Sequence, residues 1–330
     1  MKTVIKILKD YTIFIMLIFL AVIFTMGNPA FISSSNIITI LRQSCILGIC
    51  AMGQMTILIV GGVNLSMGSS VSLTTVFIAL LTVRMGVPWP VAFLLAVALC
   101  TAIGFATGFI IVKTKIVPMI GTIAISILIS GLSYIVCGGL PISGLSDATK
   151  WFYRGSLGPI PVPIVIWFVV IIFFTVMFKY TYYGRHIFIT GSNAEAARLS
   201  GINTTFIWVS AYTICGALAG LAGLLMLGRL GSGQPTAAET LDMDVLAALI
   251  IGGVSFLGGE GKISKAVGGI VLIALLKNGM TLNGINEYVQ KVVTGAVFLS
   301  AVCLDALQHR PKKATIASAQ VNTEKEEAKQ

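Results

Sequence analysis

The sequence has little charge. Of its 330 residues, 10% are charged and 56% are hydrophobic, and the mean hydropathy is +0.97. Because soluble domains carry about 25% charged residues, this chain lacks the polar surface that would let it face water on all sides. Its apolar runs are continuous over about 20 residues and do not alternate with a period of two, which favours membrane-spanning helices over a β-barrel. The predicted fold class is all-α, a polytopic helical membrane protein.

Signatures of catalytic and metal chemistry are also missing. The chain has two histidines and six cysteines, none in metal-ligand spacing, and neither an HExxH nor a GxSxG pattern. The stretch GGEGKIS at 258–264 fails as a phosphate loop, because Phe256 and Ile263 stand where a glycine and a hydroxyl residue are needed. We therefore predict that the chain is not an enzyme and holds no catalytic residues, cofactor or metal.

The formal net charge of +10 does not indicate a nucleic-acid partner. The basic residues lie between apolar runs and not in one patch, as is typical of membrane topology. Ionisable residues deep within the runs are scarce, although ion-coupled carriers usually need an intramembrane carboxylate. Asp242 and Asp244 lie at one predicted outer edge, where solvated or interfacial carboxylates are the simplest interpretation. A transporter without a coupling group of its own draws energy from elsewhere or works as a passive pore.

Apolar runs matched to a hydrocarbon core of about 30 Å predict about ten membrane segments. They are residues 11–27, 44–60, 66–83, 89–112, 117–137, 162–179, 206–228, 245–257, 266–282 and 288–306. The excess of lysine and arginine on the N-terminal side of the membrane predicts that both chain ends are cytoplasmic and that 138–161 is the longest outer loop. The transmembrane domain covers 1–310, and the polar tail, 311–330, is predicted to be disordered and cytoplasmic.

Glycines four residues apart occur in two of the predicted segments. The pairs are Gly104 with Gly108 and Gly216 with Gly220. Small residues at this spacing let two helix backbones approach closely, so we predict that these glycines form helix-packing faces.

The polar stretch GSNAEAARLSGINT at 191–204 carries the signals of a short capped helix. Ser192 and Glu195 fit a capping box, in which each side chain accepts a hydrogen bond from the backbone amide of the other residue. Gly201 suits a left-handed cap at the end of the helix. The stretch lies within the loop 180–205, which is predicted to be cytoplasmic.

A helix of about two turns does not hold by itself in water, so it needs a packing partner. Ala196, Ala197 and Leu199 are predicted to form one face that is small enough to enter a groove on a second protein. The alternative is a plain connector that packs on its own bundle.

Four stretches in order give the chain a resemblance to a known family. GSNAEAARLSGIN resembles the cytoplasmic loop of permease subunits in ribose-type ABC importers, and GGVNLSMGS at 61–69 resembles their GGxDLSxGS segment, with Asn64 where aspartate is usual. LDMDVLAALIIGG at 241–253 resembles their ELDAIAAVxIGG, and 258–290 resembles their glycine-rich turn and the span after it. The resemblance covers roughly 11–306.

The resemblance implies a type II ABC importer-like permease in the bacterial inner membrane, specific for a monosaccharide such as ribose. Its expected partners are a cytoplasmic ABC ATPase dimer, a periplasmic sugar-binding protein, a second permease subunit, identical or different, and membrane lipid, with no nucleic acid. The residues implied in ATPase coupling are Ser192, Asn193, Glu195, Ala196, Ala197, Arg198 and Gly201. The residues implied in the translocation path are Asn64, Ser66 and Asp244. The competing hypotheses are an ion-coupled secondary carrier or passive channel acting alone, and a membrane scaffold that transports nothing.

Overall fold

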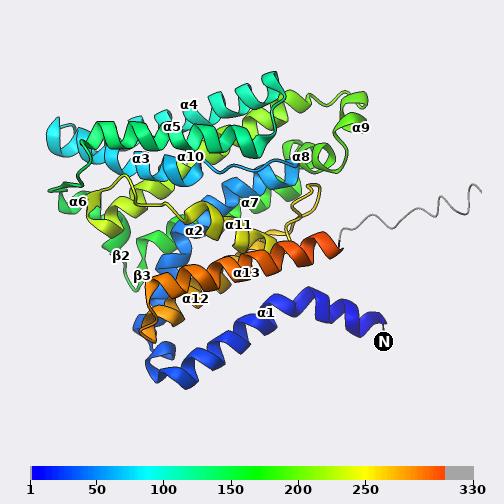
Figure 1. The fold of residues 1–330 in the computed structure, drawn as a ribbon, viewed down its shortest axis with the longest axis horizontal. Coiled ribbons are helices and arrows are strands. Elements are labelled where there is room, and N and C mark those ends of the chain that lie inside the picture. Colours follow the sequence, from blue (N-terminus) through cyan, green and yellow to red (C-terminus); the bar gives the residue numbers. More distant parts are fainter. Residues whose placement is uncertain (1, 309–330) are drawn as a thin grey trace, which may run out of the picture.

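The computed structural model describes residues 2–308, and nearly all of the regular structure in that range is helical (Figure 1). The α-helices are α1 (Lys2–Gly27), α2 (Ser34–Val60), α3 (Met67–Ala79), α4 (Trp89–Thr114), α5 (Pro118–Cys137), α6 (Asp147–Arg154), α7 (Val162–Tyr180), α8 (Tyr182–Ser192), α9 (Ala194–Leu199), α10 (Thr204–Leu230), α11 (Leu241–Ile251), α12 (Ile263–Leu282) and α13 (Glu287–Gln308). A 3-10 helix, η1 (Pro29–Ile32), precedes α2, and a π-helical segment, η2 (Leu80–Arg84), continues α3. The predicted tail, 311–330, lies outside the described residues.

Each of the ten predicted membrane segments corresponds to one of these helices. Within residues 2–308, seven helices are long and apolar enough to cross a membrane by length and composition, α3 being counted together with η2. The other three are α1, whose apolar part is Ile13–Gly27, the short α11 and the amphipathic α13. The fold class and the number of about ten segments are therefore confirmed.

Two predicted boundaries were wrong. The second segment begins at Ser34 and not at residue 44, because the Ser33 side chain accepts a hydrogen bond from the Asn36 amide and starts α2 within a polar stretch. The eighth segment ends at Ile251 and not at residue 257, because Gly252 and Gly253 stop α11 and a glycine-rich turn follows. Apolar composition alone could not separate that turn from the helix.

The core is built around α2, which runs through the middle of the bundle and is buried over most of its length (Figure 1). Helices α4 and α10 lie side by side, and their glycines make the contact that the spacing predicted. A Cβ atom at Gly104 would overlap with the backbone of Tyr212, and one at Gly216 would overlap with the backbone of Cys100. The predicted packing faces are thus confirmed as a close approach of α4 and α10.

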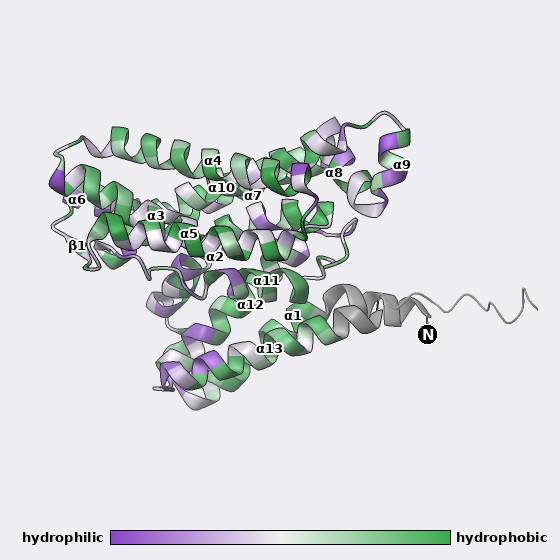
Figure 2. Ribbon diagram, turned by 45° about the horizontal axis from the view of Figure 1, so that its top comes forward, coloured by the Kyte–Doolittle hydropathy of each residue, from purple (hydrophilic) through white to green (hydrophobic). Residues whose placement is uncertain are grey.

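The two ends of the bundle differ. Helices α8 and α9 lie at one end together with the N-terminal end of α1 and the last turn of α13, whereas α6 lies at the other (Figure 1). At the α6 end, β1 (Ile142–Ser143) pairs with β4 (Ser232–Gly233), and β2 (Ser156–Leu157) pairs with β3 (Ile160–Pro161), both antiparallel. Figure 2 shows that hydrophilic residues gather on α6 and α9, while the long helices between them are mostly hydrophobic.

Candidate functional site: a capped helix joined to a buried polar cluster

The predicted capped helix exists as α9, but its N-terminal cap differs from the prediction. Asn193 is the capping residue, and its side-chain oxygen accepts from the Ala196 amide at 2.9 Å. Ser192 is the last residue of α8, and its hydroxyl donates to the carbonyl of Phe188 at 2.9 Å. The Glu195 carboxylate accepts from Arg198 at 2.7 Å. The predicted capping box between Ser192 and Glu195 was therefore wrong, because Ser192 belongs to α8, a helix that the sequence analysis did not predict.

The C-terminal cap of α9 is confirmed. Gly201 has a φ of +82°, which places it in the left-handed region that favours glycine. Its amide donates to the carbonyl of Arg198 at 3.0 Å, and the Ile202 amide donates to that of Ala197 at 3.0 Å. These two bonds form a Schellman motif, which satisfies carbonyls at the helix end. The helix is thus held at both ends by its own sequence.

The exposed face of α9 is not the predicted one. Ala197 is completely buried and seats the helix on its own chain, so it does not belong to the outer surface with Ala196 and Leu199. Leu199 is 79% exposed, and the ion pair between Glu195 and Arg198 lies on the same surface with both side chains 67% exposed. An exposed ion pair contributes little to stability. The surface available to a partner is therefore centred on an apolar leucine with charged neighbours.

The cap gives a test of which residue starts α9. We expect Asn193→Ala to destabilise the helix by about 1 kcal/mol, because the Ala196 amide loses its partner. Ser192→Ala should have little effect, because the Ser192 hydroxyl bonds within α8. Amide hydrogen exchange across 194–199 measures this difference: only the Asn193 variant should exchange faster. Faster exchange in the Ser192 variant alone would support the capping box instead.

Four glycines connect α9 to the core, and we call them the glycine joint: Gly61, Gly191, Gly258 and Gly259. A Cβ atom at Gly191, near the end of α8, would overlap with the carbonyl oxygen of Ile59 in α2. One at Gly259 would lie 2.6 Å from the Ser192 hydroxyl, and one at Gly258 would lie 3.0 Å from the Cα atom of Gly61. The Gly259 amide donates to the carbonyl of Ile59 at 2.8 Å. The ends of α2 and α8 and the turn between α11 and α12 therefore touch backbone to backbone.

The break after α2 contains two of the predicted translocation residues. Gly61 ends α2 in the left-handed conformation, and the side-chain oxygen of Asn64 accepts from both the amide and the hydroxyl of Ser66, at 2.9 and 2.7 Å. Asn64 and Ser66 are 5% and 2% exposed. The Asn64 side chain thus forms a local turn that leads into α3, and its place in the translocation path stays a prediction.

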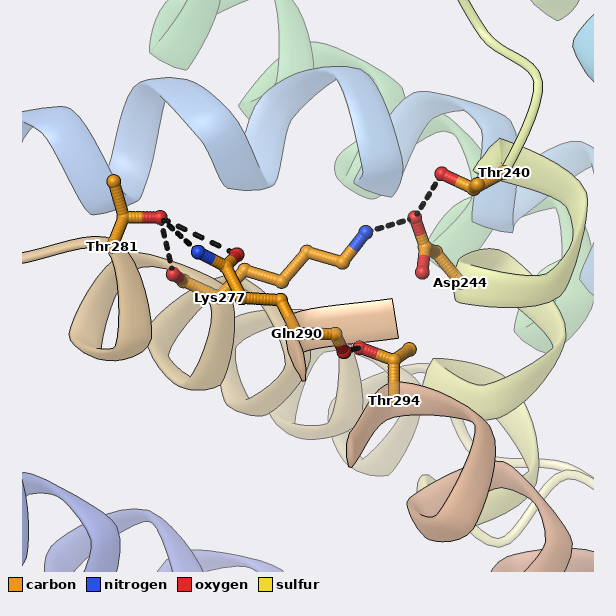
Figure 3. Close-up of polar contacts among 6 residues, drawn as sticks. All are labelled: Thr240, Asp244, Lys277, Thr281, Gln290 and Thr294. Atoms are coloured by element: carbon orange, nitrogen blue, oxygen red, sulfur yellow. Dashed lines mark hydrogen bonds and ion pairs between the residues drawn. The ribbon is translucent and has the colours of Figure 1, made fainter. Parts of the chain in front are cut away.

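Asp244 of α11 is buried, so its interpretation as a solvated group was wrong, whereas Asp242 is half-buried. Asp242 accepts from the Gly68 amide at 2.7 Å and thereby ties α11 to the first turn of α3. Asp244, 6% exposed, forms an ion pair with Lys277 of α12, and the Thr240 hydroxyl donates to it at 3.4 Å (Figure 3). The composition of α11 could not reveal this burial, because the covering helices α2, α12 and α13 are distant or follow later in the sequence.

Sequence reasoning missed the partners of Asp244. Lys277 reaches along α12 toward Asp244, and Thr281 and Gln290 make side-chain hydrogen bonds to each other beside its stem (Figure 3). One signal was present, because Lys277 is a charged residue within the predicted segment 266–282. An ionisable residue in such a segment indicates a functional site by default, with its partner to be identified. The three helices α11, α12 and α13 therefore share a polar cluster.

Many apolar helices, a capped polar helix at one end and a part-buried ion pair between α11 and α12 are the features of a polytopic membrane protein. A family model described as the permease component of a branched-chain amino acid transport system matches residues 36–302. The chain therefore belongs to this family of transport permeases.

The similar proteins include sugar permeases. The chain is 36% identical to the ribose import permease protein RbsC of Bacillus subtilis over 88% of this chain and 91% of that protein. It is 34% identical to the protein of the same name in Escherichia coli K12, over 90% and 94% of the two chains. It is 31% identical to the galactose/methyl galactoside import permease protein MglC of E. coli K12, over 94% and 98%. No solved structure matches the chain.

Proposed function

We propose that this chain is the transmembrane permease subunit of an ATP-driven importer that moves a monosaccharide, ribose or a similar sugar, across the bacterial inner membrane. The names of its relatives support this proposal, since both groups import monosaccharides or their simple glycosides. The positive-inside pattern of the sequence supports a cytoplasmic position for α9 and for both chain ends.

The single observation that carries the coupling mechanism is α9 itself. This short helix is capped at both ends, seated by one buried alanine, and presents Leu199 to the outside. It would dock in a cleft of a cytoplasmic ATPase, so that closure of an ATPase dimer on ATP moves it as a rigid body. The seven residues from Ser192 to Gly201 named above are the proposed coupling segment. Among them, Asn193, Ala197 and Gly201 position the helix, and Arg198 would face the partner together with the neighbouring Leu199.

The chemistry of ATP hydrolysis then lies in the partner, and this chain supplies the lever and the pathway. A periplasmic sugar-binding protein would deliver the solute to the outer end, where α6 and the short strands lie, and a second permease subunit would complete the path. Asn64, Ser66 and Asp244 remain the proposed path residues. Asp244 is the one among them whose side chain forms an ion pair with a lysine.

Solute uptake tests the proposed substrate class. The chain is produced together with the proposed ATPase and sugar-binding protein, in cells that lack other ribose and galactose uptake systems. We expect these cells to accumulate labelled ribose, or failing that labelled galactose, only when all three components are present. Accumulation of a branched-chain amino acid in place of both sugars would overturn the substrate assignment.

A further inference from the structure

The ion pair between Asp244 and Lys277 joins α11 to α12, but an ion pair removed from water is weak evidence of a stabilising role. Charges buried in a protein lose their hydration, and apolar residues of similar size at the same positions often give equal or greater stability. A buried carboxylate with a half-buried lysine as its partner, set among apolar helices, therefore calls for a functional explanation. The contrast with Asp242 is informative, because that carboxylate accepts from a fixed backbone amide and ties α11 to α3.

Lys277 is the member of the ion pair that can change its hydrogen-bond partner. Its side chain is 34% exposed, whereas that of Asp244 is 8% exposed. A lysine carries its charge on a flexible stem of four carbons, and its ammonium group has three donors that can turn toward new acceptors. The ammonium group can thus leave Asp244 or share it with a ligand without unfolding α12.

The groups around the pair match a neutral solute rich in hydroxyl groups. Thr240 donates to Asp244 at 3.4 Å, and Thr281 and Gln290 form a second pair one turn beyond Lys277 along α12. The cluster thus offers a carboxylate, an ammonium group, hydroxyls and an amide with no net charge (Figure 3). A sugar hydroxyl can donate to the carboxylate and accept from the ammonium group at once, whereas an ion would be opposed by one of the two charges.

We propose that Asp244 and Lys277, flanked by Thr240, Thr281 and Gln290, form a binding point for the hydroxyl groups of the transported solute. A passing sugar would insert between the carboxylate and the ammonium group and would replace their direct contact by two hydrogen bonds. This inference rests on the proposed function, and it adds to it the residues of α12 and α13 and the preference for an uncharged solute.

The decisive variant removes both charges at once, so that neither is left buried alone. We expect Asp244→Leu with Lys277→Met to insert, to bind the ATPase and to keep its thermal stability, since the pair gives way to apolar side chains of similar size. Uptake of labelled ribose should show a KM raised at least about tenfold with ATP hydrolysis retained. A KM like that of the unaltered complex would overturn the proposal. If the unaltered complex takes up neither ribose nor galactose, the proposed substrate class fails by itself.

Two further variants distinguish a role of the ion pair in solute binding from a purely structural role. The exchange Asp244→Lys with Lys277→Asp keeps an ion pair but moves the ammonium group and its flexible stem from α12 to α11. We expect it to assemble and to transport poorly, and full recovery of uptake would show that any ion pair suffices and contradict the proposal.

Lys291→Met removes an exposed lysine of the neighbouring helix α13 and should leave the KM unchanged. An equal rise in KM there would reveal a general dependence on positive charge and would also contradict it.

Discussion

Gly191→Ala is expected to lower the rate of solute uptake at least about a hundredfold. The variant chain should still insert into the membrane and still bind its ATPase. The added methyl group would overlap with the carbonyl oxygen of Ile59. Because this neighbour is backbone and cannot rotate away, the end of α8 must move off α2, and overpacking of this kind typically costs 1–3 kcal/mol. The surface of α9 around Leu199 stays unchanged. Uptake of labelled sugar and co-purification of the ATPase measure the two effects separately.

Gly131→Ala is the matched control for this experiment. Gly131 lies within α5, and nothing stands within 4 Å of a Cβ atom added there. Alanine is favoured over glycine inside a helix, so this variant should transport normally. Normal uptake by Gly191→Ala as well would show that the glycine joint does not carry the movement of α9 into the core.

Leu199→Asp is expected to separate the chain from its ATPase. Leu199 is 79% exposed on α9, so the folded subunit tolerates a charge there, but a partner that buries this side chain would not. Loss of a central apolar contact in an interface costs about 2 kcal/mol or more, roughly a thirtyfold loss of affinity. Co-purification from detergent at increasing dilution measures the loss.

Two controls accompany this variant. Leu140→Asp changes a leucine that is 72% exposed at the α6 end of the molecule, away from the proposed cytoplasmic surface, and it should leave ATPase binding intact. Leu199→Met conserves the volume of the side chain and should also bind. If Leu199→Asp retained its ATPase as firmly as Leu140→Asp, α9 would not be the docking helix.

The helices of the bundle could be predicted because apolar runs of this length have few other solutions in a membrane. Prolines and glycines also mark the ends in the expected order: Pro118 begins α5, and Gly138 and Gly231 end α5 and α10 in the left-handed conformation. Glycine spacing further predicted the contact of α4 with α10. These features depend on neighbours in the sequence or on one repeated spacing.

The parts that the sequence did not predict depend on distant contacts. Ser192 and Asn193 are both good capping residues, and the choice between them depends on how far α8 extends. Asp244 and Lys277 are 33 residues apart, and nothing in α11 alone indicates which helix covers its carboxylates. Gly191 and Gly259 read as ordinary loop glycines, although each lies against the backbone or side chain of a segment far away in the chain.

Purified complex in sealed vesicles, with the binding protein and labelled ribose outside and ATP enclosed, tests the central claim most directly. Vesicles that contain this chain together with its ATPase should accumulate the sugar, and vesicles that contain this chain alone should accumulate none. Equal accumulation without the ATPase, driven by an ion gradient or by the sugar gradient itself, would contradict the account and identify a carrier or channel.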